Sequence, residues 1–123
     1  MRSCVTQILI RPSPDRWSIH AGGTFLGESS QALELREGSY QPVLYFPRAD
    51  IAMDLLERTD HATVCPHKGV ASYFSIVTPL GPIRNAVWSY EAPKQQMGAI
   101  AGYLAFYPDR VTVARQAGRQ EAS

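Results

Sequence analysis

The sequence has no marked excess of charge of either sign. Its 12 lysine and arginine residues are nearly balanced by 11 acidic residues, which leaves a formal net charge of +1 over 123 residues. Proteins that bind nucleic acids through the phosphates need a basic surface, so we expect no nucleic-acid partner. Long apolar runs are also missing. None approaches the roughly 20 residues that span a bilayer, so we expect no membrane partner.

Targeting signals and disulfide patterns are absent too. A short apolar piece near the N-terminus is interrupted by Thr6 and Gln7 and closed by Arg11, which argues against a signal peptide. The two cysteines, Cys4 and Cys65, lie in unrelated contexts and predict reduced thiols rather than a disulfide framework. Together these features predict a cytoplasmic protein.

Motifs that would bind a nucleotide or a metal ion are missing or incomplete. The sequence contains neither GxGxxG nor GxxxxGK[ST], the glycine-rich motifs that bind nucleotide phosphates. His61, Cys65 and His67 are of the residue types that zinc prefers, but there is no Cys-x-x-Cys pair and no obvious fourth ligand. We therefore expect neither a metal site nor a cofactor.

What the sequence does contain is enough apolar material for one core. Hydrophobic residues make up 45% of the chain and charged residues 19%, a composition typical of a folded globular protein. A length of 123 residues suits a single domain, 1–123. We expect an ordered core over about residues 15–115, followed by a polar, frayed C-terminal tail.

Short segments that alternate apolar and polar residues, or that are rich in β-branched and aromatic residues, predict about eight strands. They are residues 16–21, 24–29 and 32–37, expected to form a meander; 42–47; and the pairs 70–77 with 83–90 and 103–107 with 111–115, expected to form hairpins. Gly22 and Gly23 predict a tight turn between the first two strands, because glycine accepts a positive φ without steric cost.

One segment has helical spacing instead. Ile51, Leu55 and Leu56 recur at helical intervals after an acidic start, which predicts a short helix over residues 48–59. Residues 94–102 predict one helical turn or a loop, because two glycines weaken a helix there. Since strands dominate, we predict a mainly β fold, a compact antiparallel barrel or tent-like fold with one or two short helices.

The densest group of reactive side chains falls in residues 59–69, which we expect to form a rigid loop. Nearby positive charge stabilises a thiolate, and Lys68 follows Cys65 by three residues. Cys65 would then act as a nucleophile with His61 as a possible base. A small buried cysteine is the alternative interpretation. The candidate catalytic residues are His61, Cys65 and Lys68.

The same segment predicts a binding site for a small polar or anionic ligand. A lysine followed by a glycine presents a positive charge and an accessible backbone N–H, and an arginine early in the next strand could flank them. Tyr and Trp side chains combine an apolar ring with a polar atom, which suits the wall of a cleft as well as a core. The candidate ligand-binding residues are Lys68, Gly69, Tyr73, Arg84, Trp88 and Tyr90.

Several longer stretches resemble a known family. They are "YQPVLYFPRADIAMDLLERTDHATVCPHKGVASYFSI", "NAVWSYEAP" and "IAGYLAFYPDRV", and the resemblance extends from about Trp17 to Val113. The chain is similar to the uncharacterised family called domain of unknown function four hundred and twenty-seven, which implies an all-β, tent- or barrel-like fold. His67 stands where an aromatic residue is usual in the family.

The family is sometimes labelled nucleotidyltransferase-like, and such activity generally implies paired carboxylates that hold Mg²⁺. Here Asp50 and Asp54 are four residues apart on the predicted helix, and no predicted strand carries a D-x-D pair. The motif residues of the family map onto Tyr45, Pro47, Asp50, Thr59, His61, Cys65, Pro66, Lys68, Gly69, Tyr73, Trp88, Tyr90, Phe106 and Tyr107.

We therefore expect a small-molecule site in a cleft between residues 59–73 and the aromatic strand of Trp88. Three alternatives stay open: an enzyme with Cys65 as nucleophile, a nucleotidyltransferase-like activity, and an interaction scaffold that binds partners at an exposed strand edge. The sequence does not decide whether the protein is an enzyme, and a homo-oligomer is compatible with it.

Overall fold

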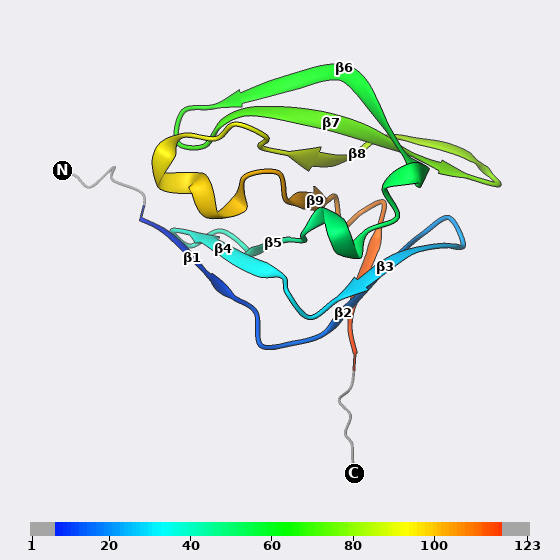
Figure 1. The fold of residues 1–123 in the computed structure, drawn as a ribbon, viewed down its shortest axis with the longest axis horizontal. Coiled ribbons are helices and arrows are strands. Elements are labelled where there is room, and N and C mark those ends of the chain that lie inside the picture. Colours follow the sequence, from blue (N-terminus) through cyan, green and yellow to red (C-terminus); the bar gives the residue numbers. More distant parts are fainter. Residues whose placement is uncertain (1–6, 117–123) are drawn as a thin grey trace, which may run out of the picture.

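Ten strands and three short 3-10 helices make up the described part of the chain (Figure 1). The computed structural model describes residues 7–116. Cys4 and residues 117–123, which belong to the predicted frayed tail, lie outside this range. The strands are β1 (Ile8–Pro12), β2 (Trp17–Ala21), β3 (Thr24–Ser29), β4 (Leu33–Glu37), β5 (Val43–Tyr45), β6 (Leu56–Cys65), β7 (Gly69–Thr78), β8 (Gly81–Ser89), β9 (Leu104–Phe106) and β10 (Thr112–Arg115). The 3-10 helices are η1 (Arg48–Asp50), η2 (Met53–Leu55) and η3 (Gln95–Ile100).

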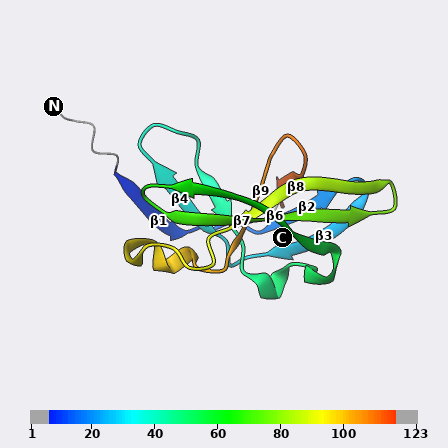
Figure 2. The same cartoon turned by 90° about the horizontal axis from the view of Figure 1, so that it is seen from above.

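The strands form three antiparallel sheets, with the orders β1-β4-β5, β10-β2-β3 and β6-β7-β8-β9. The long strands of the four-stranded sheet cover one side of the molecule, and the two smaller sheets lie opposite them (Figure 1, Figure 2). The predicted mainly β, antiparallel fold is confirmed. The barrel alternative is wrong for the described residues, because three separate sheets do not close into one.

The pairing of the strands departs from the sequence prediction at two places. β2 and β3 form the predicted hairpin, but β4 pairs with β1 and β5, so the meander is wrong. The hairpin of β7 and β8 is confirmed. The hairpin of β9 and β10 is wrong, because β9 pairs with β8 and β10 with β2. The turn after β9 carries Val111 into the core, where it is 2% exposed, and so directs β10 away from β9.

Residues 48–59 do not form the predicted helix. The helices η1 and η2 are separated by Ile51, whose extended backbone pairs with Gly27 of β3. Ile51 is buried in the core, and Leu56 already begins β6. Long-range pairing therefore outweighs the local helical spacing. In residues 94–102 the helix η3 confirms the predicted helical turn.

Residues 59–69 are mostly strand rather than the rigid loop that we expected. β6 continues to Cys65, and only residues 66–68 form the turn before β7 begins at Gly69. β6 is the outer strand of its sheet, and its residues 60–64 are exposed. An exposed edge strand shows no apolar alternation, so the pattern that identifies strands was missing here.

Two clusters of buried side chains form the core, and β7 and β8 contribute to both. The first cluster includes Ile19 and Leu26 and lies where β2 and β3 meet the four-stranded sheet. The second includes Leu35, Tyr45 and Tyr73 and lies where β4 and β5 meet the same sheet. The second cluster is rich in tyrosine, and the candidate site opens within it.

Candidate functional site

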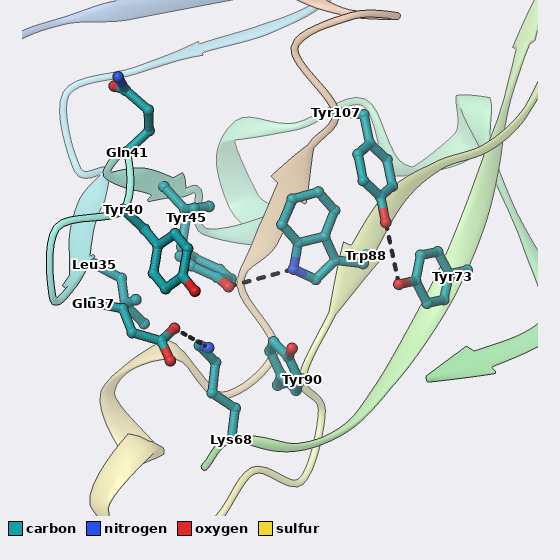
Figure 3. Close-up of a pocket in the computed structure, with 11 residues that line it drawn as sticks. Leu35, Glu37, Tyr40, Gln41, Tyr45, Lys68, Tyr73, Trp88, Tyr90 and Tyr107 are labelled. Carbon is teal, nitrogen blue, oxygen red and sulfur yellow. Dashed lines mark hydrogen bonds and ion pairs between the residues drawn. The ribbon is translucent and has the colours of Figure 1, made fainter. Parts of the chain in front are cut away.

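A pocket of about 240 Å³ opens at the second cluster (Figure 3). More than half of the residues around it are Tyr or Trp, and its one ion pair joins a lysine to a glutamate. It is lined by Leu35, Glu37, Tyr40, Gln41, Val43, Tyr45, Lys68, Tyr73, Trp88, Tyr90 and Tyr107. These residues come from β4, β5, β7 and β8 and from the connections after β4, β6, β8 and β9, so the fold assembles the pocket from distant parts of the chain.

Lys68 is buried, which is uncommon for a lysine. The residue is only 8% exposed, and its ammonium group donates a hydrogen bond to Glu37 Oε1 at 2.7 Å. Its backbone is fixed as well, because its N–H donates to the Cys65 carbonyl and its carbonyl accepts from the Lys94 N–H. The ammonium and carboxylate neutralise each other's charge, yet both keep hydrogen-bonding capacity. The pair therefore offers one donor and one acceptor to the pocket.

The aromatic side of the pocket is held together by contacts among its own side chains. The Trp88 indole N–H donates to the Tyr45 hydroxyl at 3.3 Å, and its ring centroid lies 4.6 Å from that of Tyr107. The hydroxyl groups of Tyr107 and Tyr73 lie 3.3 Å apart, and their rings are nearly parallel. Because neighbouring rings fix one another, this wall is largely formed without a ligand.

Burial raises the pKa of three phenols of the pocket further above neutral pH. Loss of hydration raises the pKa of Tyr45 to about 12. It also raises the pKa of Tyr107 to about 12, with a further contribution from the hydrogen bond to Tyr73. The pKa of Tyr90 is likewise raised, mainly by burial. All three hydroxyl groups are therefore neutral at neutral pH and can donate as well as accept hydrogen bonds.

Among residues 7–116, no side-chain hydrogen bond involves the Tyr90 hydroxyl group, and in Figure 3 no dashed line joins it to the other pocket residues. Tyr90 is 8% exposed, and its side chain lines the pocket. A buried polar group without a partner costs about 1–3 kcal/mol. A polar group of a bound molecule would remove this cost.

The structure brings some of the predicted site residues together and leaves the others apart. Lys68, Tyr73, Trp88 and Tyr90 line the same pocket. The predicted residues outside its lining are His61, Cys65, Gly69 and Arg84. The pocket therefore includes part of the predicted cleft between residues 59–73 and the strand of Trp88, and its opposite side comes from β4 and β5.

The predicted pair of Cys65 and His61 is not assembled. Cys65 is half-buried, and its thiol lies 3.6 Å from the Lys68 ammonium nitrogen. His61 is exposed on β6, with its ring centroid 4.5 Å from that of Tyr73. Cys65 follows His61 by four positions along β6, which in an extended strand corresponds to roughly 13 Å. His61 therefore cannot take a proton directly from Cys65, and the nucleophile and base that the sequence predicted do not meet.

Gly69 and Arg84 are the two remaining candidates, and their positions in the fold explain why neither lines the pocket. Gly69 is the first residue of β7 and lies against the chain at Pro93 and Lys94. Arg84 is exposed on β8, and its carbonyl accepts a hydrogen bond from Arg110. Neither residue contributes to the charge at the Lys68 end of the pocket.

Several residues of the pocket were not predicted as ligand-binding residues, among them Glu37, and Tyr45 and Tyr107, which were named only among the residues of the family motif. Glu37 is 31 positions from Lys68, and no spacing rule connects them. Tyr45 shares the alternation of a predicted strand, which marks it as inward-facing but not as part of a site. Tyr107 belongs to the family motif, but the final hairpin predicted around it does not form, so its position beside Trp88 could not be predicted.

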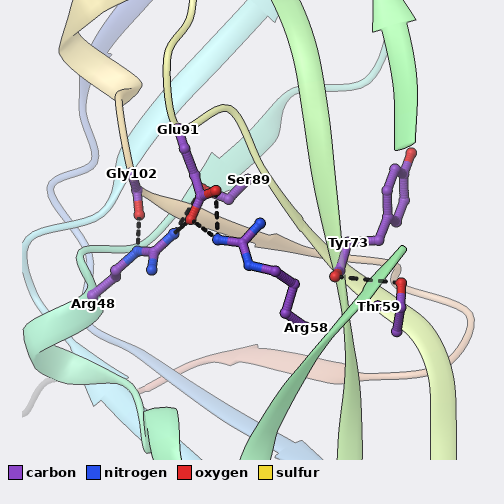
Figure 4. A network of polar contacts seen from close by, with 7 residues as sticks. All are labelled: Arg48, Arg58, Thr59, Tyr73, Ser89, Glu91 and Gly102. Carbon is purple, nitrogen blue, oxygen red and sulfur yellow. Dashed lines mark hydrogen bonds and ion pairs between the residues drawn. The ribbon is translucent and has the colours of Figure 1, made fainter. Parts of the chain in front are cut away.

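A second polar cluster joins η1 and β6 to the end of β8 (Figure 4). Glu91 accepts hydrogen bonds from Arg48 at 2.6 Å and from Arg58 at 2.6 and 2.5 Å. Both guanidinium groups also lie over the Phe74 ring. The hydrogen bonds from Arg58 are the main reason that the pKa of Glu91 is lowered, and those from Arg48 add to the effect. Because both guanidinium groups are hydrogen-bonded to the same carboxylate and packed on Phe74, we interpret this cluster as structural.

The described residues do not suggest a metal centre or a membrane span. Within residues 7–116, no three His, Cys, Asp or Glu side chains gather in a way that could hold a metal ion. Over the same range, no helix has the length and apolar character that a bilayer span requires. Asp50, one of the carboxylates weighed for Mg²⁺, accepts a hydrogen bond from Ser29 at 2.6 Å instead.

The fold and the pocket define a mainly β protein with an aromatic pocket closed at one end by a Lys–Glu ion pair. Residues 9–117 match the family labelled NTP_transf_9 and described as Domain of unknown function (DUF427), and the chain belongs to this family. The resemblance noted from the sequence is thereby confirmed. No curated protein matches the chain. Among the described residues no group of three or more His, Cys, Asp or Glu side chains could hold a metal ion, so the structure adds no support to the nucleotidyltransferase label.

Proposed function

We propose that the protein binds a small polar organic ligand in the pocket of Lys68, Trp88 and Tyr90. The observation that carries the proposal is the Tyr90 hydroxyl, which is buried, lines the pocket and has no partner among the described residues. Beside it, the Lys68–Glu37 pair supplies a further donor and acceptor. Three polar groups that converge within an aromatic wall are typical of a site that orients a ligand.

The charges of the pocket favour a ligand without net charge. Lys68 disfavours a cation, and Glu37 at 2.7 Å from it disfavours a strong anion such as a phosphate. The aromatic wall favours a flat or ring-shaped molecule, because ring stacking adds to the burial of apolar area. A neutral ring that carries an amide or hydroxyl group satisfies both conditions. The sequence predicts a polar or anionic ligand. The carboxylate of Glu37 beside Lys68 favours the neutral polar class over the anionic one.

Three compounds with the same ring test this proposal: benzamide, benzoate and benzamidine. In a Trp17→Phe variant Trp88 is the only remaining tryptophan, so its fluorescence reports binding in the pocket. We expect benzamide to bind more tightly than the anion or the cation. Tyr90→Phe should weaken benzamide binding about two- to twelvefold, because one neutral hydrogen bond contributes about 0.5–1.5 kcal/mol.

Tyr103→Phe is the matched control, since Tyr103 packs on the same cluster but does not line the pocket. It should bind benzamide as the parent variant does. The proposal is wrong if none of the three compounds changes the Trp88 fluorescence or the amide NMR signals of the pocket residues. It is also wrong if benzoate or benzamidine binds more tightly than benzamide.

A further inference from the structure

A second, more apolar pocket adjoins the first one. Its volume is about 220 Å³. It is lined by Gln41, Pro42, Val43, Leu44, Phe46, Trp88, Phe106, Pro108 and Val113. Apart from the amide of Gln41 and the indole N–H of Trp88, these side chains are apolar. No titratable side chain lies in this lining. The second pocket can therefore bury an apolar group of a ligand, but it has few polar groups that would orient one.

The two pockets meet at three shared residues, Gln41, Val43 and Trp88. Strand β5 explains how one short segment serves both. Side chains alternate along a strand, so Tyr45 faces the first pocket and Leu44 the second, while Val43 at the start of the strand borders both. The same alternation at the end of β9 places Phe106 on the second pocket and Tyr107 on the first.

The volumes of the two pockets are a further reason to treat them as parts of one site. Sites for small organic ligands usually enclose roughly 300–1,000 Å³. Each of these pockets alone is smaller, at about 240 and 220 Å³, whereas the two together fall within that range. Trp88 lines both pockets, and its hydrogen bond to Tyr45 helps to fix the position of its ring (Figure 3).

We infer that the two pockets form one bipartite site for an amphipathic ligand, with a polar ring in the first pocket and an apolar arm in the second. The inference rests on the proposed function of the first pocket and adds the class of ligand. The arm lies against Leu44, Phe106 and Val113, and the polar ring lies between Trp88 and the Lys68–Glu37 pair. Trp88 contacts both parts of the ligand.

The test compares the affinity for benzamide with the affinity for 3-butylbenzamide or 4-butylbenzamide, whichever of the two alkylated compounds binds more tightly. Each methylene group that becomes buried should strengthen binding about fourfold. In Val113→Phe, where a larger ring occupies the second pocket, the advantage of the butyl compound should fall toward zero. In the control Thr112→Phe it should persist, because Thr112 is the exposed neighbour on the same strand and lies outside both linings.

A second measurement does not depend on any substitution in the pocket. In the unsubstituted protein, the methyl NMR signals of Leu44 and Val113 should shift with the butyl compound and not with benzamide. If benzamide binds but the butyl group adds no affinity and leaves these methyl signals unchanged, the bipartite site is wrong and the proposed function stands. If neither compound binds, both proposals are wrong.

Discussion

Gly27 occupies a position on β3 where a side chain does not fit. Its φ is +150°, and a Cβ atom built on it would lie 2.1 Å from the Asp50 carbonyl oxygen. The contact arises because Ile51 pairs with Gly27 and brings the chain at Asp50 against the strand. The absence of a side chain at this residue thus allows the connection before β6 to pack on β3.

We expect Gly27→Ala to reduce the free energy of unfolding substantially more than Gly23→Ala. Both glycines have a positive φ, +150° and +76°, but nothing lies within 4 Å of a Cβ atom at Gly23. Gly23→Ala should therefore cost only the backbone strain of about 1–2 kcal/mol, while Gly27→Ala adds a clash with backbone. Urea denaturation of both variants measures the difference. Equal midpoints would show that the connection at Asp50 moves aside without cost.

Lys68 shows how a residue can be found from the sequence and still be misjudged. The sequence singles it out because of Gly69 and Cys65 beside it, and it does line the pocket. Its partner Glu37 belongs to a different sheet, so the charge that Lys68 offers to a ligand depends on tertiary structure. Local spacing identifies reactive side chains, but it cannot show which opposite charges the fold brings to them.

At the scale of elements, the polar cluster around Glu91 connects the edge strand β6 to β8. The pKa of Glu91 is lowered from its ordinary value of 4.5, mainly by the hydrogen bonds from Arg58. A carboxylate with a lowered pKa in the folded state stabilises the fold above its ordinary pKa. This contribution declines as the pH falls from 4.5 through the lowered value, because the folded state then also takes up the proton.

We therefore expect Glu91→Gln to be less stable than the unsubstituted protein at pH 7, and the difference to shrink below pH 4.5. Glutamine keeps the shape of the side chain but carries no charge, so it resembles the protonated carboxyl group. Urea denaturation of both proteins at several pH values from 7 to 3 measures the difference in their free energy of unfolding. Because acid affects the other groups of both proteins alike, that general effect cancels in the difference. A difference that is constant over this range would contradict the role assigned to the ion pairs.

The elements also show which sequence patterns are reliable. β2, β7 and β8 were predicted because one or both of their faces are buried, and buried faces leave apolar alternation or β-branched runs. β6 was missed because most of its residues are exposed. The helix expected over residues 48–59 failed because Ile51 pairs with a distant strand, an interaction that local spacing does not encode.

At the scale of the molecule, the two clusters of the core are joined by the same two strands. β7 contributes Phe74 to the first cluster and Tyr73 to the second, and β8 contributes Val87 to the first. Trp17 packs on the first cluster and Trp88 on the second. Since neither cluster is complete without β7 and β8, we expect residues 7–116 to unfold as one cooperative unit, as the predicted single domain requires.

Single-tryptophan variants test this expectation. In Trp17→Phe the fluorescence of Trp88 reports on the second cluster, and in Trp88→Phe the fluorescence of Trp17 reports on the first. Within each variant the urea midpoint of fluorescence should equal the midpoint of far-ultraviolet circular dichroism, even if the substitutions change the stability. An earlier Trp88 transition in Trp17→Phe would instead show that the pocket unfolds before the rest. The aromatic wall would then be only locally stable, and part of the ligand's binding energy would be spent on ordering it.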